Sequence, residues 1–259
     1  MPGFDPFKLS SIVYRGVARI RDGLEERRYY RFRGGRWYGG IATGDVVGCN
    51  LRCKFCWSWR YSFYTNKGFF QTPQQVYEKL TRIAEKRKYR YIRLSGGEPT
   101  ITMKHLLQLL ELLDQTKFVF ILETNGLLIG YHREYAEELA TYRKIAVRVS
   151  FKGTTPEEFE QLTGADKKYY EYQFKALENL IDAGLKPGEQ VYPAVMLSFS
   201  PEENIRKFLD RLREIHSVLA QEIDPEYIIL YPHVVELLRK NKLKPRIAYK
   251  PNGIPEFMI

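Results

Sequence analysis

The chain has 259 residues, a length that suits one large domain or two small ones. Hydrophobic residues make up 44% and charged residues 28%, which excludes a wholly disordered or fibrous protein. No apolar run approaches the roughly 20 residues that span a bilayer, and residues 1–8 lack a basic-then-apolar signal. We therefore expect a soluble cytoplasmic protein with no membrane partner. The net charge of +10 permits an anionic partner such as RNA without requiring one.

Residues 1–40 differ from the rest of the chain because arginines alternate there with apolar and aromatic residues. These arginines are Arg15, Arg19, Arg21, Arg27, Arg28, Arg31, Arg33 and Arg36. The pattern predicts a basic, aromatic N-terminal extension, folded as a hairpin or a cover. The aromatic residues beside the arginines could stack on RNA bases, and solvated charge on edge strands explains the same pattern equally well.

From residue 41 onward, strand-like and helix-like segments alternate. The predicted strands are Ile41–Val47, Tyr91–Ser95, Phe118–Thr124, Ile145–Phe151, Val191–Phe199 and Tyr227–Tyr231. Helix starts are predicted at Thr72-Pro73, Thr155-Pro156 and Ser200-Pro201, where a hydroxyl cap precedes proline, and further helices at Met103–Gln115, Glu134–Thr141, Tyr169–Ala183 and His233–Asn241.

Six strands alternating with helices indicate an α/β fold, a partial (β/α)6 TIM-like barrel of parallel strands. We place this core at residues 41–235, after the N-terminal extension. A basic tail at 236–259 packs on the core or extends it. In such a fold the functional site gathers at the C-terminal ends of the strands.

All three cysteines, Cys49, Cys53 and Cys56, follow the first predicted strand with the spacing C-x3-C-x2-C. An odd number crowded into one loop is a poor disulfide framework. Structural zinc takes four ligands, so a zinc site here needs a remote histidine. A 4Fe–4S cluster held by three thiolates leaves one iron open to a substrate or cofactor. No cysteine remains for a second cluster.

A second motif, Ser95-Gly96-Gly97-Glu98-Pro99, ends the second predicted strand. The two glycines allow close approach of the backbone, and a carboxylate with nearby carbonyls suits an ammonium group. Together with the cysteine spacing and the aromatic Phe55 before the last cysteine, this motif resembles the radical S-adenosylmethionine (SAM) superfamily. The resemblance implies a 4Fe–4S cluster on Cys49, Cys53 and Cys56, and SAM whose amino group is oriented by Gly96, Gly97 and Glu98. It also places Phe55 in the cofactor site.

Weaker matches extend the resemblance. Thr124 and Asn125 belong to a Glu-Thr-Asn-Gly run that resembles the segment near the SAM ribose. Ser150 and Lys152 fall in a stretch similar to that of glycyl-radical-enzyme activating enzymes, and are candidates for the SAM carboxylate or ribose. Ser150 stands where those activases have aspartate. Trp57 and Trp59 either line the substrate mouth or pack on the loop.

The resemblance implies an enzyme, an oxidoreductase or modifying enzyme, that cleaves SAM reductively to a 5′-deoxyadenosyl radical and abstracts hydrogen from a substrate. It also implies a low-potential electron donor. The first substrate hypothesis is a protein, as for an activase. RNA, either tRNA or rRNA, is the alternative, and a small nucleotide-like molecule is a third. A non-catalytic iron–sulfur or zinc protein that binds RNA is the alternative from another class.

Overall fold

A computed structural model describes residues 3–259. Its main sheet follows the order β1-β2-β3-β5-β6-β7-β8-β9. Neighbouring strands from β3 to β9 pair in parallel, so the chain contains the six parallel strands of the predicted partial barrel. These strands are β3 (Ile41–Val46), β5 (Tyr91–Ser95), β6 (Val119–Thr124), β7 (Ile145–Phe151), β8 (Val191–Met196) and β9 (Asp224–Glu226).

The N-terminal extension continues the same sheet. Strands β1 (Ala18–Arg21) and β2 (Leu24–Gly35) form an antiparallel hairpin, and β2 pairs antiparallel with β3. A short strand, β4 (Phe69–Gln71), pairs with the other side of β2. The predicted hairpin is confirmed. It is preceded by a helix that we did not predict, α1 (Pro6–Val17), whose first turn is capped by the Asp5 carboxylate.

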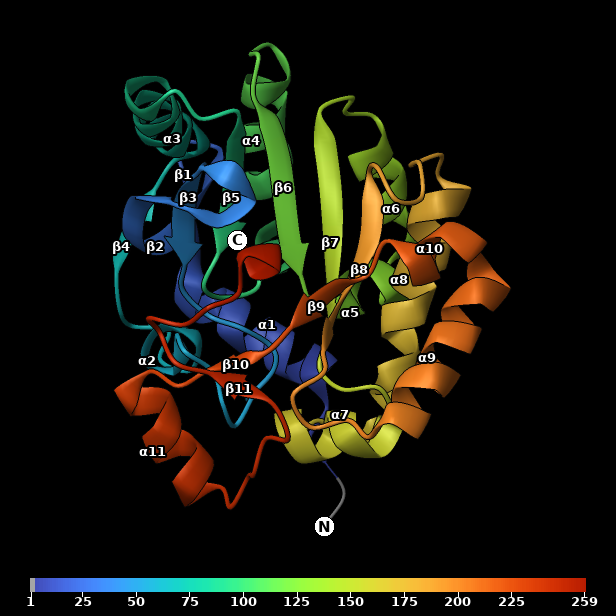
Figure 1. Cartoon of the computed structure of the whole chain (residues 1–259). Helices are drawn as coiled ribbons and strands as arrows, with labels where there is room; N and C mark the ends of the chain where they lie inside the picture. The colour runs from blue at the N-terminus through green and yellow to red at the C-terminus, as the bar shows by residue number, and fades with distance from the viewer. Residues whose placement is uncertain (1–2) are drawn as a thin grey trace.

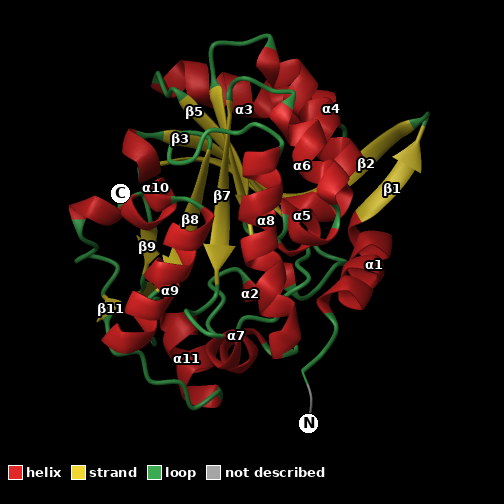
Figure 2. Ribbon diagram, turned by 90° about the vertical axis from the view of Figure 1, so that its right-hand side faces the viewer, coloured by secondary structure: helices red, strands yellow, loops and turns green. Residues whose placement is uncertain are grey.

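Helices cover the outer face of the sheet (Figure 2). After α1, the α-helices of the described residues are α2 (Trp59–Ser62), α3 (Pro73–Arg87), α4 (Met103–Asp114), α5 (Leu127–Tyr131), α6 (Arg133–Ala140), α7 (Pro156–Thr163), α8 (Glu171–Asp182), α9 (Glu202–Ile215), α10 (Ser217–Gln221) and α11 (Pro232–Lys240). Short 3-10 helices occur at η1 (Trp37–Gly39), η2 (Pro99–Thr102), η3 (Lys167–Tyr170) and η4 (Glu256–Met258).

Two of the three predicted helix caps are confirmed. The Thr72 hydroxyl accepts from the Gln75 N–H, and the Gln75 side-chain oxygen accepts from the Thr72 N–H. The Thr155 hydroxyl accepts from the Glu158 N–H. The third was wrong. Helix α9 begins at Glu202 with Pro201 as its cap, and the Ser200 hydroxyl instead donates to Glu158 at 2.6 Å.

The sixth strand also differs from the prediction. It is β9, whose sequence Asp-Pro-Glu carries no hydrophobic residue to mark a strand. Within the predicted segment Tyr227–Tyr231, only Ile228–Ile229 is a strand (β10), and it pairs with β11 (Ala248–Tyr249) in a separate small sheet. In Figure 1 this small sheet and α11 lie at the end toward which β6 and β7 point. The C-terminal segment thus adds a layer beside the carboxyl ends of the strands.

The main core lies between the sheet and its helices. Strand β7 is buried along its whole length, and Phe151 packs edge-on against Phe174 of α8 and Phe208 of α9. A smaller cluster joins Phe55 of the cysteine loop to Val234 and Leu238 of α11. Within the described residues, no helix is long and apolar enough to cross a membrane.

Candidate active site

The cysteine loop follows β3, and backbone hydrogen bonds to α2 hold the start of the loop in position. The Tyr61 carbonyl accepts from the Gly48 N–H and the Ser62 carbonyl from the Cys49 N–H, both at 3.0 Å. The Ser58 hydroxyl lies 3.3 Å from the Cys56 sulfur. Cys49, Cys53 and Cys56 all line one cavity of about 1000 Å³. The structure therefore brings the three predicted ligands together at the wall of a single cavity.

The Gly96-Gly97 run packs directly on the cysteine loop. A Cβ at position 97 would lie 2.2 Å from the Gly48 carbonyl oxygen, and the Glu98 N–H donates to that same oxygen at 2.8 Å. Gly96 has a φ of +90°, a conformation that favours glycine. Both glycines line the cavity. Their small size allows the two loops to meet.

The Glu98 carboxylate is buried and accepts four hydrogen bonds from protein donors. One oxygen accepts from the Thr100 N–H, the Thr100 hydroxyl and the Thr124 hydroxyl, and the other accepts from the Asn125 N–H at 2.8 Å. Glu98 lines the cavity. Its carboxylate ties the loop after β5 to the loop after β6.

Asn125 connects that second loop to the cysteines. Its oxygen accepts from the Leu127 N–H, which fixes the orientation of the side-chain amide. The amide nitrogen donates to the Asn50 oxygen at 2.7 Å and lies 3.9 Å from the Cys49 sulfur. Thr124 and Asn125 both line the cavity. Their polar side-chain atoms hold neighbouring loops in position.

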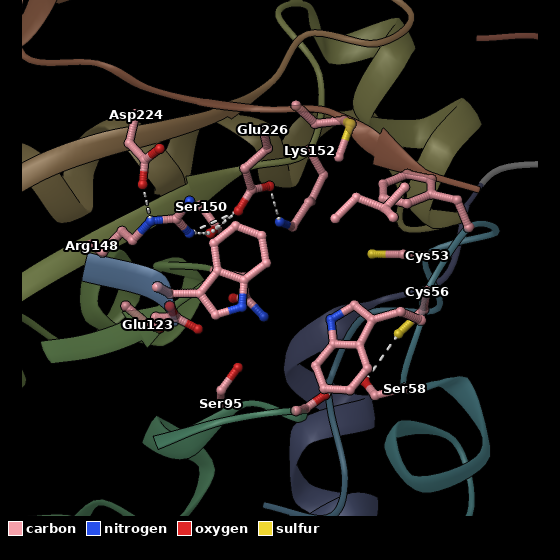
Figure 3. Close-up of a pocket in the computed structure, with 18 of the residues that line it drawn as sticks. Cys53, Cys56, Ser58, Ser95, Glu123, Arg148, Ser150, Lys152, Asp224 and Glu226 are labelled. Atoms are coloured by element: carbon pink, nitrogen blue, oxygen red, sulfur yellow. Dashed lines mark hydrogen bonds and ion pairs between the residues drawn. The ribbon is translucent and has the colours of Figure 1, made fainter. Parts of the chain in front are cut away.

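Ser150 and Lys152 lie on β7 or just after it, and both contact Glu226 of β9. Glu226 accepts from the Lys152 ammonium at 2.8 Å, the Ser150 hydroxyl at 3.0 Å and the Arg148 guanidinium at 2.8 Å. Figure 3 shows this group across the cavity from Cys53 and Cys56. Burial raises the pKa of Glu226, but the adjacent Lys152 and Arg148 outweigh it and lower the value to about 2. Burial lowers the pKa of Lys152, yet the adjacent Glu226 carboxylate outweighs it and leaves the pKa raised.

Most of the charged residues that line the cavity were not predicted from the sequence. Arg93 pairs with Glu123 across β5 and β6, and Arg148 bridges to Asp224 at 2.5 Å. The sequence signal that could have identified them is a single charged residue within an otherwise apolar strand, namely Arg93 in β5, Glu123 in β6 and Arg148 in β7. Arg148, Ser150 and Lys152 also stand at alternate positions, which places them on one face of β7. Asp224 and Glu226 were hidden because β9 was not recognised as a strand.

The burial of the cysteine thiols favours their ligation of a positively charged metal cluster. Burial raises the pKa of Cys49 to about 12 and raises that of Cys53 further, so neither forms a thiolate there without added positive charge. Metal ligation supplies that charge. Within residues 3–259, no three His, Cys, Asp or Glu side chains converge as ligands of a single metal ion would. The buried Asn50 nitrogen, next to Cys49, has no hydrogen-bond partner among the described residues.

The family model for the radical SAM superfamily matches residues 45–213, which include both motifs. The chain belongs to this superfamily. Radical SAM proteins use a 4Fe–4S cluster and SAM, so both cofactors are assigned to the chain, and it is a radical SAM enzyme.

Among curated proteins, it is 31% identical over 138 residues to a probable GTP 3′,8-cyclase of Thermococcus kodakarensis, covering 53% of this chain and 42% of the relative. The chain spans about half the length of the curated relatives that it matches. These relatives are named as cyclases of GTP, so the closer resemblance to glycyl-radical-enzyme activases is not confirmed.

Solved structures agree on the fold. The structure of TYW1 with a lysine–pyruvate adduct bound superposes with a TM-score of 0.52 at 16% identity, covering 92% of this chain and 89% of the other. Streptococcus suis SuiB bound to S-adenosylmethionine gives a TM-score of 0.53 at 18% identity, covering 81% of this chain and 45% of SuiB. At these identities the likeness concerns the fold alone.

Proposed function

We propose that Cys49, Cys53 and Cys56 ligate the 4Fe–4S cluster and that SAM binds beside them in the cavity. The observation that carries this assignment is that the three thiols and the Gly96-Gly97 backbone line the same cavity. When bound, the cluster would supply the electron for reductive cleavage of SAM, which is the chemistry that would remove hydrogen from the substrate. The protein then has to orient SAM and exclude other reactions.

The chain's own residues divide this work. The backbone at Gly96 and Gly97 approaches the SAM amino group, while Glu98 keeps their loop in place through its four hydrogen bonds. Lys152 and Ser150 stand opposite the cysteines and offer a cation and a hydroxyl to the SAM carboxylate or ribose. Phe55 supplies an apolar wall, since it packs against Phe199 at a ring distance of 5.7 Å.

Lys152 acts as a fixed cation in this proposal. A Schiff-base lysine needs a lowered pKa to supply a neutral amine. The pKa of Lys152 is raised, because Glu226 stabilises the ammonium form at 2.8 Å. Its charge therefore suits electrostatic binding of an anionic group on SAM or the substrate.

We further propose that the substrate carries a nucleotide, either free or within RNA. The curated relatives named for GTP support a nucleotide. The cavity is also lined by Trp37, Trp57 and Tyr231, whose rings can stack on a base. Arg31 and Arg33 line it too, both held by the buried Asp45, and guanidinium groups suit phosphate. The activase-like protein substrate stays a prediction.

The cofactor assignment is tested by anaerobic reconstitution. The wild-type protein should bind about four irons and four sulfides, and should release 5′-deoxyadenosine from SAM when a reductant is added. Cys53→Ala should lose both properties, whereas Lys54→Ala, one residue away in the same loop, should keep the iron. A wild-type protein that binds zinc in place of a four-iron centre, or that leaves SAM intact, would overturn the assignment.

The substrate proposal is tested by isotope transfer. Ribonucleoside triphosphates deuterated on the ribose, and separately a deuterated total RNA, are incubated with the reduced enzyme and SAM. Deuterium in 5′-deoxyadenosine from the first sample indicates a free nucleotide, and from the second sample RNA. If deuterium is transferred from neither of these samples but is transferred from deuterated cell protein, the substrate is a protein and not a nucleotide.

A further inference from the structure

Two serine hydroxyls lie between the cysteine loop and the loop after β5. Ser58 immediately precedes α2 and Ser62 ends it, and their hydroxyl oxygens are 2.8 Å apart. Both residues line the cavity, yet they are only 3% and 1% exposed. We call Ser58 and Ser62 the serine pair.

Neither hydroxyl makes the hydrogen bond that a serine commonly makes in a helix. A serine before the first turn commonly caps the helix, but the Ser58 side chain accepts no backbone N–H of α2. A serine inside a helix commonly donates to the carbonyl four residues earlier, but the Ser62 hydroxyl donates to the Gly96 carbonyl at 2.8 Å. The serine pair is therefore directed at the loop after β5 and not at its own helix.

The serine pair reaches one carbonyl oxygen and one sulfur. The Ser58 hydroxyl also donates to the Gly96 carbonyl, and it lies 3.3 Å from the Cys56 sulfur (Figure 3). The Ser62 hydroxyl lies 3.8 Å from the same sulfur. The pair thus connects the last of the three cysteines with a glycine whose backbone we assign to the SAM amino group.

The two protons of the serine pair cannot serve every acceptor at once. Each hydroxyl carries one proton. A Cys56 thiolate that ligates iron has no proton of its own, so it can only accept. When both hydroxyls donate to Gly96, the sulfur has no donor from the pair. When Ser58 donates to Cys56, Ser62 alone holds the carbonyl.

An ammonium group at Gly96 changes this distribution of protons. In our assignment the SAM ammonium donates to the Gly96 carbonyl, where it competes with the Ser58 hydroxyl. The Ser58 hydroxyl is then free to donate to the Cys56 sulfur, 3.3 Å away. A hydrogen bond to a ligating thiolate stabilises the reduced, more negative state of a cluster.

We propose, resting on the cluster and SAM sites of the proposed function, that Ser58 and Ser62 are positioning residues that couple SAM binding to reduction of the cluster. Ser62 holds the Gly96 carbonyl in place, and Ser58 changes its acceptor from that carbonyl to the Cys56 sulfur when the ammonium binds. Only a hydroxyl hydrogen bond moves: no covalent bond forms or breaks, and the electron comes from an added reductant. Because coupling is reciprocal, the ligand binds the reduced protein more tightly than the oxidised protein.

The test uses two ligands that differ in the amino group. S-adenosylhomocysteine keeps the amino acid part of SAM but has no sulfonium to cleave, so it binds without turnover. 5′-Methylthioadenosine lacks the amino acid part. The midpoint potential of the reconstituted cluster is measured with and without each ligand, by electron paramagnetic resonance during titration with dithionite. Equilibrium dialysis gives the affinity for each ligand in the oxidised and the reduced protein.

In the wild type, we expect S-adenosylhomocysteine to bind the reduced protein about tenfold more tightly, which raises the midpoint potential by about 59 mV for one electron. 5′-Methylthioadenosine should leave the potential unchanged. Ser58→Ala should keep its iron and lose most of the shift, whereas Ser58→Thr, which keeps a hydroxyl, should retain the shift. Ser62→Ala should bind S-adenosylhomocysteine several-fold more weakly in both redox states.

Ser10→Ala is the matched control. The Ser10 hydroxyl is also buried and donates to a carbonyl, that of Pro6 in α1, at 2.9 Å. Ser10 is not among the residues that line the cavity. Its variant loses the same kind of hydrogen bond, so the potential and the ligand affinities should equal those of the wild type.

The remaining outcomes separate coupling from a merely structural role. An unchanged shift in Ser58→Ala with full iron content, or no shift in the wild type, would overturn the coupling and leave the cofactor sites intact. Wild-type affinity in Ser62→Ala would overturn its part in holding the carbonyl. A wild-type protein that assembles no four-iron cluster would instead overturn the proposed function.

Discussion

The side-chain amide of Asn125 lies 3.9 Å from the sulfur of Cys49, with its orientation fixed by the Leu127 N–H and the Asn50 oxygen. An N–H group directed at a cluster thiolate stabilises the reduced, more negative state. Asn125→Ala removes this donor, so we expect the midpoint potential of the bound cluster to become more negative. A redox titration followed by electron paramagnetic resonance measures the shift.

The control for this variant is Asn179→Ala. The Asn179 side chain donates to the Ile129 carbonyl, away from the cysteines, so its removal should leave the potential unchanged. An unchanged potential in Asn125→Ala, with full iron content, would show that the amide only positions the loop.

Asn125 illustrates what the sequence could reveal of the site. The cysteine spacing and the double glycine follow strands with strong hydrophobic patterns, so their meeting at one end of the sheet could be predicted. The partners of Asn125 could not, because Asn50 and Cys49 lie about 75 positions away and the contact depends on how two loops pack. The same limit applies to Glu98, two of whose four donors belong to Thr124 and Asn125 at the end of β6.

The fold was likewise predictable in part. Strands β3, β5, β6, β7 and β8 were predicted because buried parallel strands are nearly all apolar. Strand β9 was missed because its three residues, Asp-Pro-Glu, are held by the Arg148 and Lys152 side chains rather than by hydrophobic burial. Helix α1 was not predicted, although Asp5-Pro6 combines a capping side chain with proline at the first helical position.

The Glu226 carboxylate is expected to stabilise the fold as part of a partly buried charge group. Glu226→Gln leaves Lys152 without its ion-pair partner, and because both side chains keep some exposure (17% and 18%), we expect a loss of about 1–3 kcal/mol in the free energy of unfolding. Lys152→Met should cost a similar amount. Urea unfolding of the cluster-free proteins should show that the double variant costs clearly less than the sum. Additive losses would mean that the two groups do not act as a pair.

The buried residue His105 should make stability depend on pH. Its Nδ1 donates to the Glu25 carbonyl at 2.8 Å and its Nε2 accepts from the Tyr29 hydroxyl at 2.9 Å, so the neutral ring satisfies both. Burial, with Arg27 nearby, lowers its pKa from 6.5 to about 4. Between these values the unfolded chain binds the proton and the folded chain does not, so stability falls as pH drops from 6.5 to 4.

The size of this effect is on the order of 3 kcal/mol, since each pKa unit corresponds to about 1.4 kcal/mol. His105→Gln removes the titrating ring, so its unfolding free energy should vary less over that pH range than that of the wild type. His216→Gln, a change at an exposed position, serves as the control. Parallel pH curves for the wild type and His105→Gln would contradict the prediction.

The contact between the two glycine-containing loops predicts a defect that combines stability with cofactor binding. A methyl group at Gly97 would meet the Gly48 carbonyl oxygen at 2.2 Å, and that oxygen cannot move freely because it also accepts the Glu98 N–H. Gly97→Ala should therefore cost about 1–3 kcal/mol and push the cysteine loop away from the loop after β5. Gly253→Ala, where the nearest atom to the new methyl is 4.0 Å away, should be neutral.

Calorimetry gives the stability, and equilibrium dialysis with SAM gives the binding. Because the displaced loop carries Cys49, we expect SAM affinity and iron content to fall together in Gly97→Ala. Wild-type iron content and SAM affinity in this variant would show that the close approach of the loops is not needed for the site.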